Sequence, residues 1–186
     1  MSSRADDEAI AATRLWLERA VIGLGLCPFA KAVHVKDQVR YVVSRARNAD
    51  ALLDDLEREL RHLVDTPPDE VDTTLIIHPD VLHDFLDYND FLELADGVVE
   101  ELGLEGVLQV ASFHPRYQFE GTEPDDITNC TNRSPYPTLH ILREASVDQA
   151  VAAFPDAAAI FEKNIETMKR LGKEGWDALG LEPPQA

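Results

Sequence analysis

Cysteine is scarce in this chain of 186 residues, which contains only Cys27 and Cys130. Two cysteines so far apart form neither a disulfide framework nor a metal-binding knuckle by themselves. Apolar runs of membrane-spanning length are missing too, and the first residues, MSSRADDEAI, are acidic and contain no apolar signal core. We therefore expect a protein of the reducing cytoplasm that does not enter a membrane.

Motifs of several common enzyme classes are absent from the sequence. The stretch GLGLCPFAK lacks the glycine spacing of the Walker and dinucleotide-binding fingerprints, and no Gly-x-Ser-x-Gly elbow occurs. The sequence thus gives no support for a P-loop nucleotide site or for that class of serine hydrolase. It identifies no cofactor.

Basic side chains are few, with 17 Lys and Arg against 35 Asp and Glu and a net charge of −18. The excess lies in residues 50–105, which hold 18 acidic and 2 basic side chains. Such a surface repels a phosphate backbone, so we expect no nucleic-acid binding. The acidic region is either a solvated face that maintains solubility or a docking face for a basic partner.

Length and composition are those of an ordinary globular protein. Apolar residues make up 45% of the chain and charged residues 28%. We expect one domain over residues 1–186, with a core at about 6–172 and frayed ends. The oligomeric state does not follow from the sequence.

Helix-like and strand-like patterns alternate along the chain. They predict helices at 6–24, 48–64 and 81–103, the last interrupted near Asn89, and strands at 38–45, 73–78 and 107–113. Residues 115–137 are rich in proline and are predicted to form a long loop. Residues 138–144 fit a helix or a short strand, and we favour a helix because His140 and Glu144 then lie one turn apart.

Two further helices are predicted near the C-terminus. A capping box at Ser146–Gln149 starts a helix to Phe154, and Pro155-Asp156 starts another that Gly172 ends. This order predicts an α/β fold of two or three layers, with a short, mostly parallel sheet of three to four strands flanked by helices. Right-handed crossovers then bring the strand C-termini to one edge.

Two of the predicted strands end in the same dipeptide, His-Pro, in the stretches DTTLIIHPD and GVLQVASFHPR. Ligands of open α/β sheets bind at the edge formed by strand C-termini, so His78 and His114 are candidate catalytic residues. A histidine placed there acts as acid or base, or it ties the chain down through hydrogen bonds. For His78 the structural alternative is a pair with Asp80.

The polar loop after the second of these strands supplies candidate binding residues. Arg133 offers a fork for a small anionic molecule, or it neutralises acidic residues of its own loop. Tyr117, Asn132 and His140 are candidates for the same pocket, although His140 is also read as a satisfied structural histidine. The three histidines and one cysteine or carboxylate supply enough ligands for zinc or iron, but they lack the tight spacing of metal ligands. We therefore assign no metal ligands, and a metal site stays an alternative.

Cys27 precedes Pro28, and Lys31 follows about one turn later. If its pKa is lowered there, the thiol becomes a nucleophile or a redox sensor. The alternative is a small apolar filler beside Leu26 and Phe29.

Four stretches carry a resemblance to a known family: GLGLCPFAKAV, IIHPD, QVASFHPRYQFEG and TNRSPYPTLHILREASV. They resemble the bacterial family called domain of unknown function 1415, and the resemblance extends from Trp16 to about Gly172. It implies a single-domain bacterial protein. It implies no reaction, so no catalytic residue is transferred from it.

Two functions stay open, and we favour the first. It is a small enzyme with a polar pocket, in which His114 is the acid or base and Arg133 holds an anionic metabolite. The second is a non-catalytic ligand-binding or interaction module that uses the loop 115–137 and the acidic helices. A concave site that gathers His114, Arg133 and a second histidine favours the enzyme; side chains locked in loop hydrogen bonds favour the module.

Overall fold

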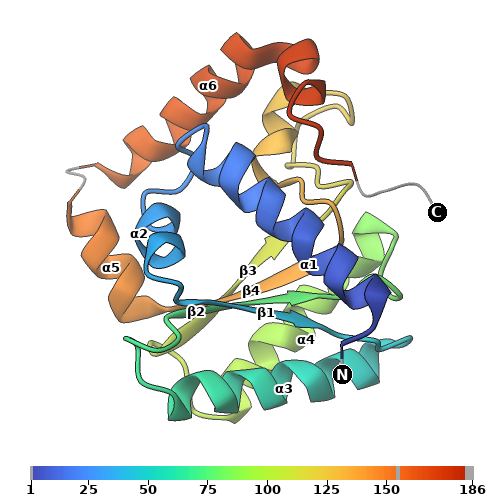
Figure 1. Ribbon diagram of the computed structural model, residues 1–186, viewed down its shortest axis with the longest axis vertical. Coiled ribbons are helices and arrows are strands. Elements are labelled where there is room, and N and C mark those ends of the chain that lie inside the picture. The colour runs from blue at the N-terminus through green and yellow to red at the C-terminus, as the bar shows by residue number, and fades with distance from the viewer. Residues whose placement is uncertain (1, 154–155, 183–186) are drawn as a thin grey trace.

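A four-stranded sheet lies at the centre of the fold, and helices cover both of its faces (Figure 1). The computed structural model describes residues 2–153 and 156–182. Across the sheet the order is β1 (Val39–Val43), β2 (Thr73–Ile77), β4 (Thr138–Arg143) and β3 (Leu108–Phe113). β1 pairs with β2 in parallel, whereas β4 is antiparallel to both β2 and β3. Consequently β1, β2 and β3 point the same way, and β4 is inserted between the last two in the opposite direction.

The α/β prediction is confirmed, but the helix favoured for residues 138–144 is wrong. Residues 138–143 form β4 and Glu144 starts the next helix, so two of the three strand pairings are antiparallel and the sheet is not mostly parallel. Leu139 and Ile141 are fully buried in the core below the sheet, whereas His140 and Leu142 line a space on the other side. This alternation has the period of a strand, and burial between two neighbouring strands outweighs the single helical contact that favoured a helix.

Below the sheet lie α3 (Ala49–Asp65) and α4 (Phe85–Glu101), which contact each other (Figure 1). Four leucines at helical spacing on α3 are fully buried: Leu52, Leu56, Leu60 and Leu63. Each such side chain stabilises the fold by about 1.5–3 kcal/mol on burial. The interruption predicted near Asn89 is absent from α4, which starts at Phe85 after an Asp84 cap rather than at residue 81.

Above the sheet lie α1 (Arg4–Trp16), the π-helical segment η1 (Leu17–Ile22), α2 (Ala30–Val35) and α5 (Glu144–Ala152). Trp16 packs edge-on against Phe113 of β3, with 5.0 Å between the ring centroids. The helices on both sides make this a three-layer arrangement. The long helix α6 (Ala157–Asp177) lies furthest from the sheet and contacts η2 (Ile127–Asn132), a 3-10 turn within the predicted loop.

Some helix ends differ from the sequence prediction. The helix α2 was not predicted, and α5 starts before Ser146, whose hydroxyl donates to Asp72 at 2.7 Å instead of capping a helix. Asp156 caps α6 as predicted, and Gly172, with φ of 67°, breaks its helical geometry where an end was predicted. Phe154 and Pro155 lie outside the described residues.

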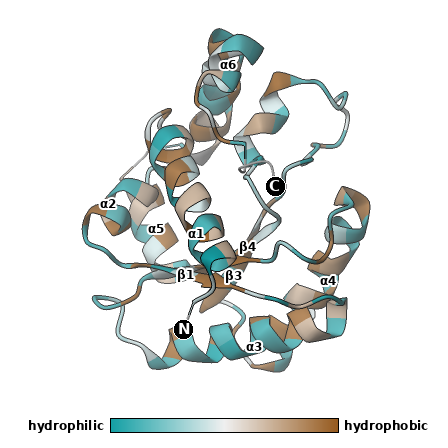
Figure 2. Cartoon of the chain, turned by 45° about the vertical axis from the view of Figure 1, so that its right-hand side comes forward, coloured by the Kyte–Doolittle hydropathy of each residue, from teal (hydrophilic) through white to brown (hydrophobic). Residues whose placement is uncertain are grey.

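Figure 2 shows hydrophobic residues gathered on the sheet and on the inner sides of the helices, with hydrophilic residues on much of the outer surface of α3. Among the described residues, no helix is both long enough and apolar enough to cross a membrane.

Candidate functional site

The two His-Pro strand ends lie at one edge of the sheet. Because β2 and β3 point the same way, His78 and His114 leave the sheet on the same side, with β4 between them. Neighbouring strands are about 4.8 Å apart, so the two backbones are about 10 Å apart across β4. The predicted shared edge is thus confirmed. Whether either histidine can bind a ligand or transfer a proton there depends on the hydrogen bonds and the protonation of its ring.

His114 uses both of its ring nitrogens within the protein. Its Nδ1 accepts a hydrogen bond from the backbone N–H of Arg116 at 3.0 Å, so the proton of the neutral ring is on Nε2. Nε2 lies 2.9 Å from the carbonyl oxygen of Leu82 and donates to it. The side chain is buried, and burial lowers the pKa of His114. This geometry favours the reading in which His114 ties its loop to the turn before α4, because no nitrogen is left for proton transfer.

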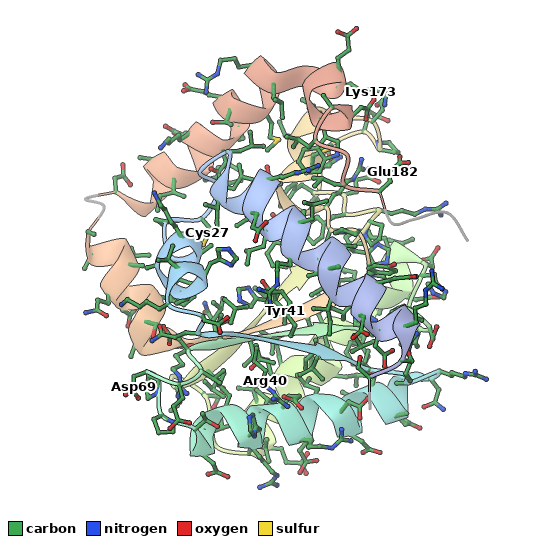
Figure 3. The ribbon with its side chains drawn as sticks, in the orientation of Figure 1. Cys27, Arg40, Tyr41, Asp69, Lys173 and Glu182 are labelled. Carbon is green, nitrogen blue, oxygen red and sulfur yellow. The ribbon has the colours of Figure 1, made fainter. Side chains whose placement is uncertain are left out.

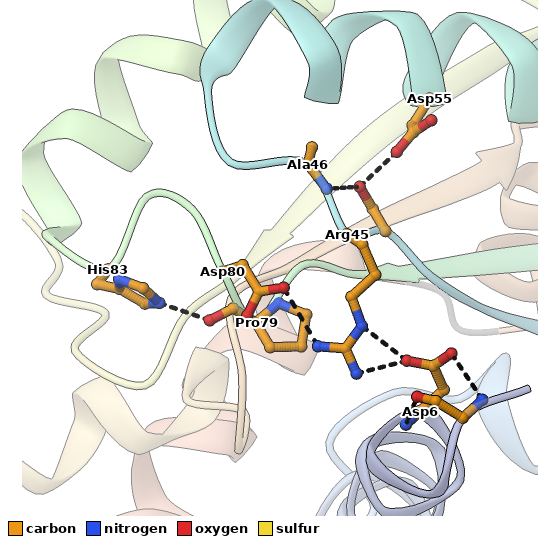
Figure 4. Close-up of polar contacts among 9 residues, drawn as sticks. Asp6, Arg45, Ala46, Asp55, Pro79, Asp80 and His83 are labelled. Carbon is orange, nitrogen blue, oxygen red and sulfur yellow. Dashed lines mark hydrogen bonds and ion pairs between the residues drawn. The ribbon is translucent and has the colours of Figure 1, made fainter.

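His78 is fully buried and has one unpaired nitrogen. Its Nδ1 donates to the carbonyl oxygen of Val81 at 3.1 Å, while Nε2 has no partner among the described residues. Burial lowers the pKa of His78 to about 4. Asp80 does not pair with this ring, because it binds Nη1 of Arg45 at 3.2 Å. Figure 4 shows Arg45 held between Asp80 and Asp6 of α1.

The ring of Tyr88 separates the two histidines. Its centroid lies 5.8 Å from that of His78 and 5.0 Å from that of His114. The hydroxyl donates to the carbonyl oxygen of Thr138 at 2.7 Å and accepts from the backbone N–H of Phe113 at 3.0 Å. This buried hydroxyl therefore ties the end of β3 to the start of β4, and the edge between the histidines is filled rather than hollow.

We expect Tyr88→Phe to lower the free energy of unfolding by about 2 kcal/mol, because a buried N–H and a buried carbonyl lose their partner. Urea denaturation followed by circular dichroism measures the change. The matched control is Tyr41→Phe, since the Tyr41 hydroxyl is buried with no partner among the described residues, and its removal should cost nothing or stabilise the protein. Equal losses in both variants would contradict the assigned role of Tyr88.

The polar loop 115–137 is held together by its own hydrogen bonds. Arg133 donates from Nε to the carbonyl oxygen of Tyr117 at 3.0 Å and from Nη2 to that of Pro124 at 2.7 Å. Asn132 donates to the carbonyl oxygen of Ser112 at 3.0 Å, and the hydroxyl of Tyr117 lies 3.2 Å from that of Ser112. These three predicted binding residues are engaged in holding the loop. The alternative role of Arg133, neutralising acidic residues of its own loop, finds no support, since none of the ion pairs among the described residues includes Arg133.

A surface hollow of about 440 Å³ lies beside this loop. Arg116 and Arg133 line it together with Asp84 and Gln118. Two guanidinium groups there attract an anion, while the Asp84 carboxylate, which caps α4, opposes it.

A different space lies above the sheet, on the side away from α3 and α4. This cavity of about 260 Å³ is bounded by β2, β3 and β4 below and by η1, α2, α5 and the start of α6 around it. Apolar side chains form most of its wall, including Trp16, Phe29, Leu75, Ala111, Phe113 and Leu142. It is larger than the cavity of roughly 150 Å³ that takes up benzene in an engineered core, and near the lower end of ordinary ligand pockets.

His140 stands at the middle of the cavity floor, with Leu75 and Ala111 beside it on the neighbouring strands. The hydroxyl of Thr73 donates to the carbonyl oxygen of Ile141 at 2.6 Å, so it is the acceptor in its 2.6 Å contact with Nε2 of His140. The proton of the neutral ring is therefore on Nε2. Nδ1 keeps a lone pair and has no partner among the described residues, and unlike Nε2 of His78 it is not sealed from solvent.

Cys27 lies on the wall of the same cavity, just before α2 (Figure 3). Burial raises the pKa of its thiol, and hydrogen bonds from the backbone of Phe29 and Ala30 only partly offset that effect. The predicted reactive thiolate is thus disfavoured at neutral pH. Cys130 is buried in a separate apolar cluster with Leu26 and Met168, and both cysteines are free.

The sequence named His140 and Cys27 as candidates but did not predict the cavity that joins them. Their common space depends on helices α2 and α5, which approach the sheet from distant parts of the chain. Ala111 and Phe29 carry no chemical signature and were not proposed. Within the described residues, no group of three or more His, Cys, Asp or Glu side chains is arranged to hold a metal ion.

Fold and site together define a three-layer α/β protein with a filled polar edge and an apolar cavity that contains one imidazole. Residues 8–178 match the family described as "Protein of unknown function (DUF1415)", and the chain belongs to that family. The resemblance seen in the sequence is thereby confirmed. No curated protein and no solved structure matches the chain.

Proposed function

We propose that this protein binds a small, mostly apolar molecule in the cavity between the sheet and helices α2 and α5, without transforming it. The supporting observation is the cavity itself, about 260 Å³ of space with a wall of apolar side chains. This is the non-catalytic ligand-binding function, in a different place from the loop 115–137. The polar edge supports an enzyme less well, because the hydrogen bonds of His114 and Arg133 are directed at the backbone.

The energetic argument for a ligand is the cost of empty space. Apolar cavities lower stability by about 24 cal/mol for each Å³, so a space of this volume costs up to about 6 kcal/mol if it is left unfilled. The cavity is partly open, which reduces that cost. An apolar ligand recovers dispersion contacts along the wall and adds its own burial, at about 25 cal/mol for each Å² removed from water.

We expect Ala111→Leu to abolish ligand binding while keeping the fold. Ala111 lies beside His140 on the cavity floor, and the larger side chain fills space that a ligand needs. The assay is an isothermal titration with para-propyltoluene, together with the rate at which iodoacetamide alkylates Cys27. In the wild type the ligand should slow alkylation several-fold, because it covers the thiol; in Ala111→Leu it should have no effect.

The control is Ala5→Leu, which adds the same side chain at an exposed position on α1 and should bind like the wild type. Binding that persists unchanged in Ala111→Leu places the ligand elsewhere. A wild type that binds no apolar probe contradicts the proposed function.

A second candidate function is an enzyme or binding site for a small anionic metabolite at the hollow beside the loop. It is supported by Arg116 and Arg133, which line the hollow. Neither of them takes part in the ion pairs formed among the described residues. If this function is correct, inorganic phosphate should raise the melting temperature of the wild type in a thermal-shift assay. Arg133→Met should remove that increase, whereas Arg58→Met on α3 should keep it. Equal stabilisation of both variants by phosphate speaks against it.

A further inference from the structure

The cavity determines which polar group a ligand can carry. No Lys, Arg, Asp or Glu side chain is among the described residues that line it. A carboxylate or an ammonium group inside would lose its water without gaining an opposite charge, which costs several kcal/mol. Neutral ligands are therefore favoured over charged ones.

His140 narrows the choice further, because its Nδ1 is a hydrogen-bond acceptor and nothing else. The Thr73 hydroxyl and the carbonyl oxygen of Ile141 keep the ring proton on Nε2 through the two 2.6 Å contacts. Burial lowers the pKa of His140 to about 4, so the ring stays neutral at physiological pH. A ligand group that binds to Nδ1 must therefore be a hydrogen-bond donor.

We propose that the ligand of this cavity is a neutral alcohol or phenol, whose hydroxyl donates a hydrogen bond to Nδ1 of His140. The inference rests on the proposed ligand-binding function and names its ligand class. A hydroxyl supplies the one donor that Nδ1 lacks, and the rest of the molecule meets the apolar wall. The volume suits a ligand of about ten non-hydrogen atoms.

Gln109 is the alternative polar partner on the cavity wall. It precedes Ala111 by two positions on β3, lines the same space, and its amide has no partner among the described residues. An amide both donates and accepts, so recognition by Gln109 would not require a donor group on the ligand. Substituting Gln109 and His140 one at a time therefore shows which of them recognises the polar group of the ligand.

The test is an isothermal titration of the full chain with three probes that have the same number of non-hydrogen atoms: para-propylphenol, para-propyltoluene and para-methylbenzoate. The phenol should bind about five- to tenfold more tightly than the toluene, the effect of one hydrogen bond, and the benzoate should bind worst. His140→Leu should bind both neutral probes equally, since leucine restores the apolar wall and leaves Thr73 its bond to Ile141. Gln109→Leu should keep the preference for the phenol.

The nitrogen chemical shift of the His140 ring gives a readout that needs no variant. In the wild type the Nδ1 resonance should move when the phenol binds and stay in place when the toluene binds. Equal affinities for these two probes, or a preference that disappears in Gln109→Leu, overturn the assignment of His140 but leave the ligand-binding function intact. Tighter binding of the benzoate overturns the neutral class. If none of the probes binds the wild type, the ligand-binding function itself fails.

Discussion

Acidification from pH 7 to pH 4 should cost this protein a large part of its stability through two of its histidines, His78 and His140. An unfolded histidine takes up a proton near pH 6.5, whereas burial lowers the pKa of both His78 and His140 to about 4 in the folded protein. Between these values the unfolded chain binds more protons, so falling pH favours unfolding, and the loss is complete once the folded state is protonated too. For His78 the difference of about 2.5 pKa units corresponds to about 3 kcal/mol. His140 adds a loss in the same direction and over the same range.

The free energy of unfolding, measured by urea denaturation at a series of pH values, checks this prediction. Because many carboxylates titrate at the lower end of the range, the decisive quantity is the difference between variants. His78→Asn keeps a donor near Nδ1 for the carbonyl oxygen of Val81 but cannot titrate, so its stability should fall less steeply between pH 6.5 and pH 4. His62→Asn changes an exposed histidine and should follow the wild type. A slope in His78→Asn equal to that of the wild type would show that His78 is not the group responsible.

The sequence predicts the layers of this fold well because local patterns and burial agree there. The leucines of α3 repeat at helical spacing, and β2 and β3 are apolar runs that end at His-Pro. Neither the strand conformation of β4 nor its direction could be predicted from the local sequence pattern. Its six residues fit a helix or a strand, and the choice is made by the two strands between which it lies.

The candidate site was predicted in part. Local sequence placed His78 and His114 at one edge, since the direction of β2 and β3 follows from their crossovers. It did not determine whether each imidazole is free, because the partners of His114 are the backbone atoms of Leu82 and Arg116. The apolar cavity was missed for a related reason. Cavities are formed by helices that do not pack fully against the sheet, and residues such as Ala111 and Phe29 give no sign of it.

Arg143 joins the end of β4 to the end of α3, a role that was not predicted. Its Nη2 lies 2.7 Å from the carbonyl oxygens of Leu63 and Thr66 and 2.9 Å from that of Val71. These atoms belong to the last turn of α3, to its cap residue Thr66 and to the segment that leads into β2. The last carbonyl groups of a helix lack the usual N–H partner four residues on, although that of Leu63 also accepts the backbone N–H of Thr66 at 3.3 Å. A cation at a helix C-terminus also interacts favourably with the helix dipole. The side chain is largely buried, and Asp72 lies 3.7 Å from its Nε.

We therefore expect Arg143→Met to lower the free energy of unfolding by about 3–4 kcal/mol, because three carbonyl groups and the Asp72 carboxylate lose a charged partner together. Arg143→Lys should recover part of the loss, since an ammonium keeps the charge but not the planar geometry. Urea denaturation at neutral pH measures both. The control is Arg58→Met, which removes an exposed ion pair with Asp55 on α3 and should cost less than about 1 kcal/mol. A similar small loss in Arg143→Met would mean that water replaces the guanidinium at these carbonyls, and that α3 is held to the sheet by its leucines alone.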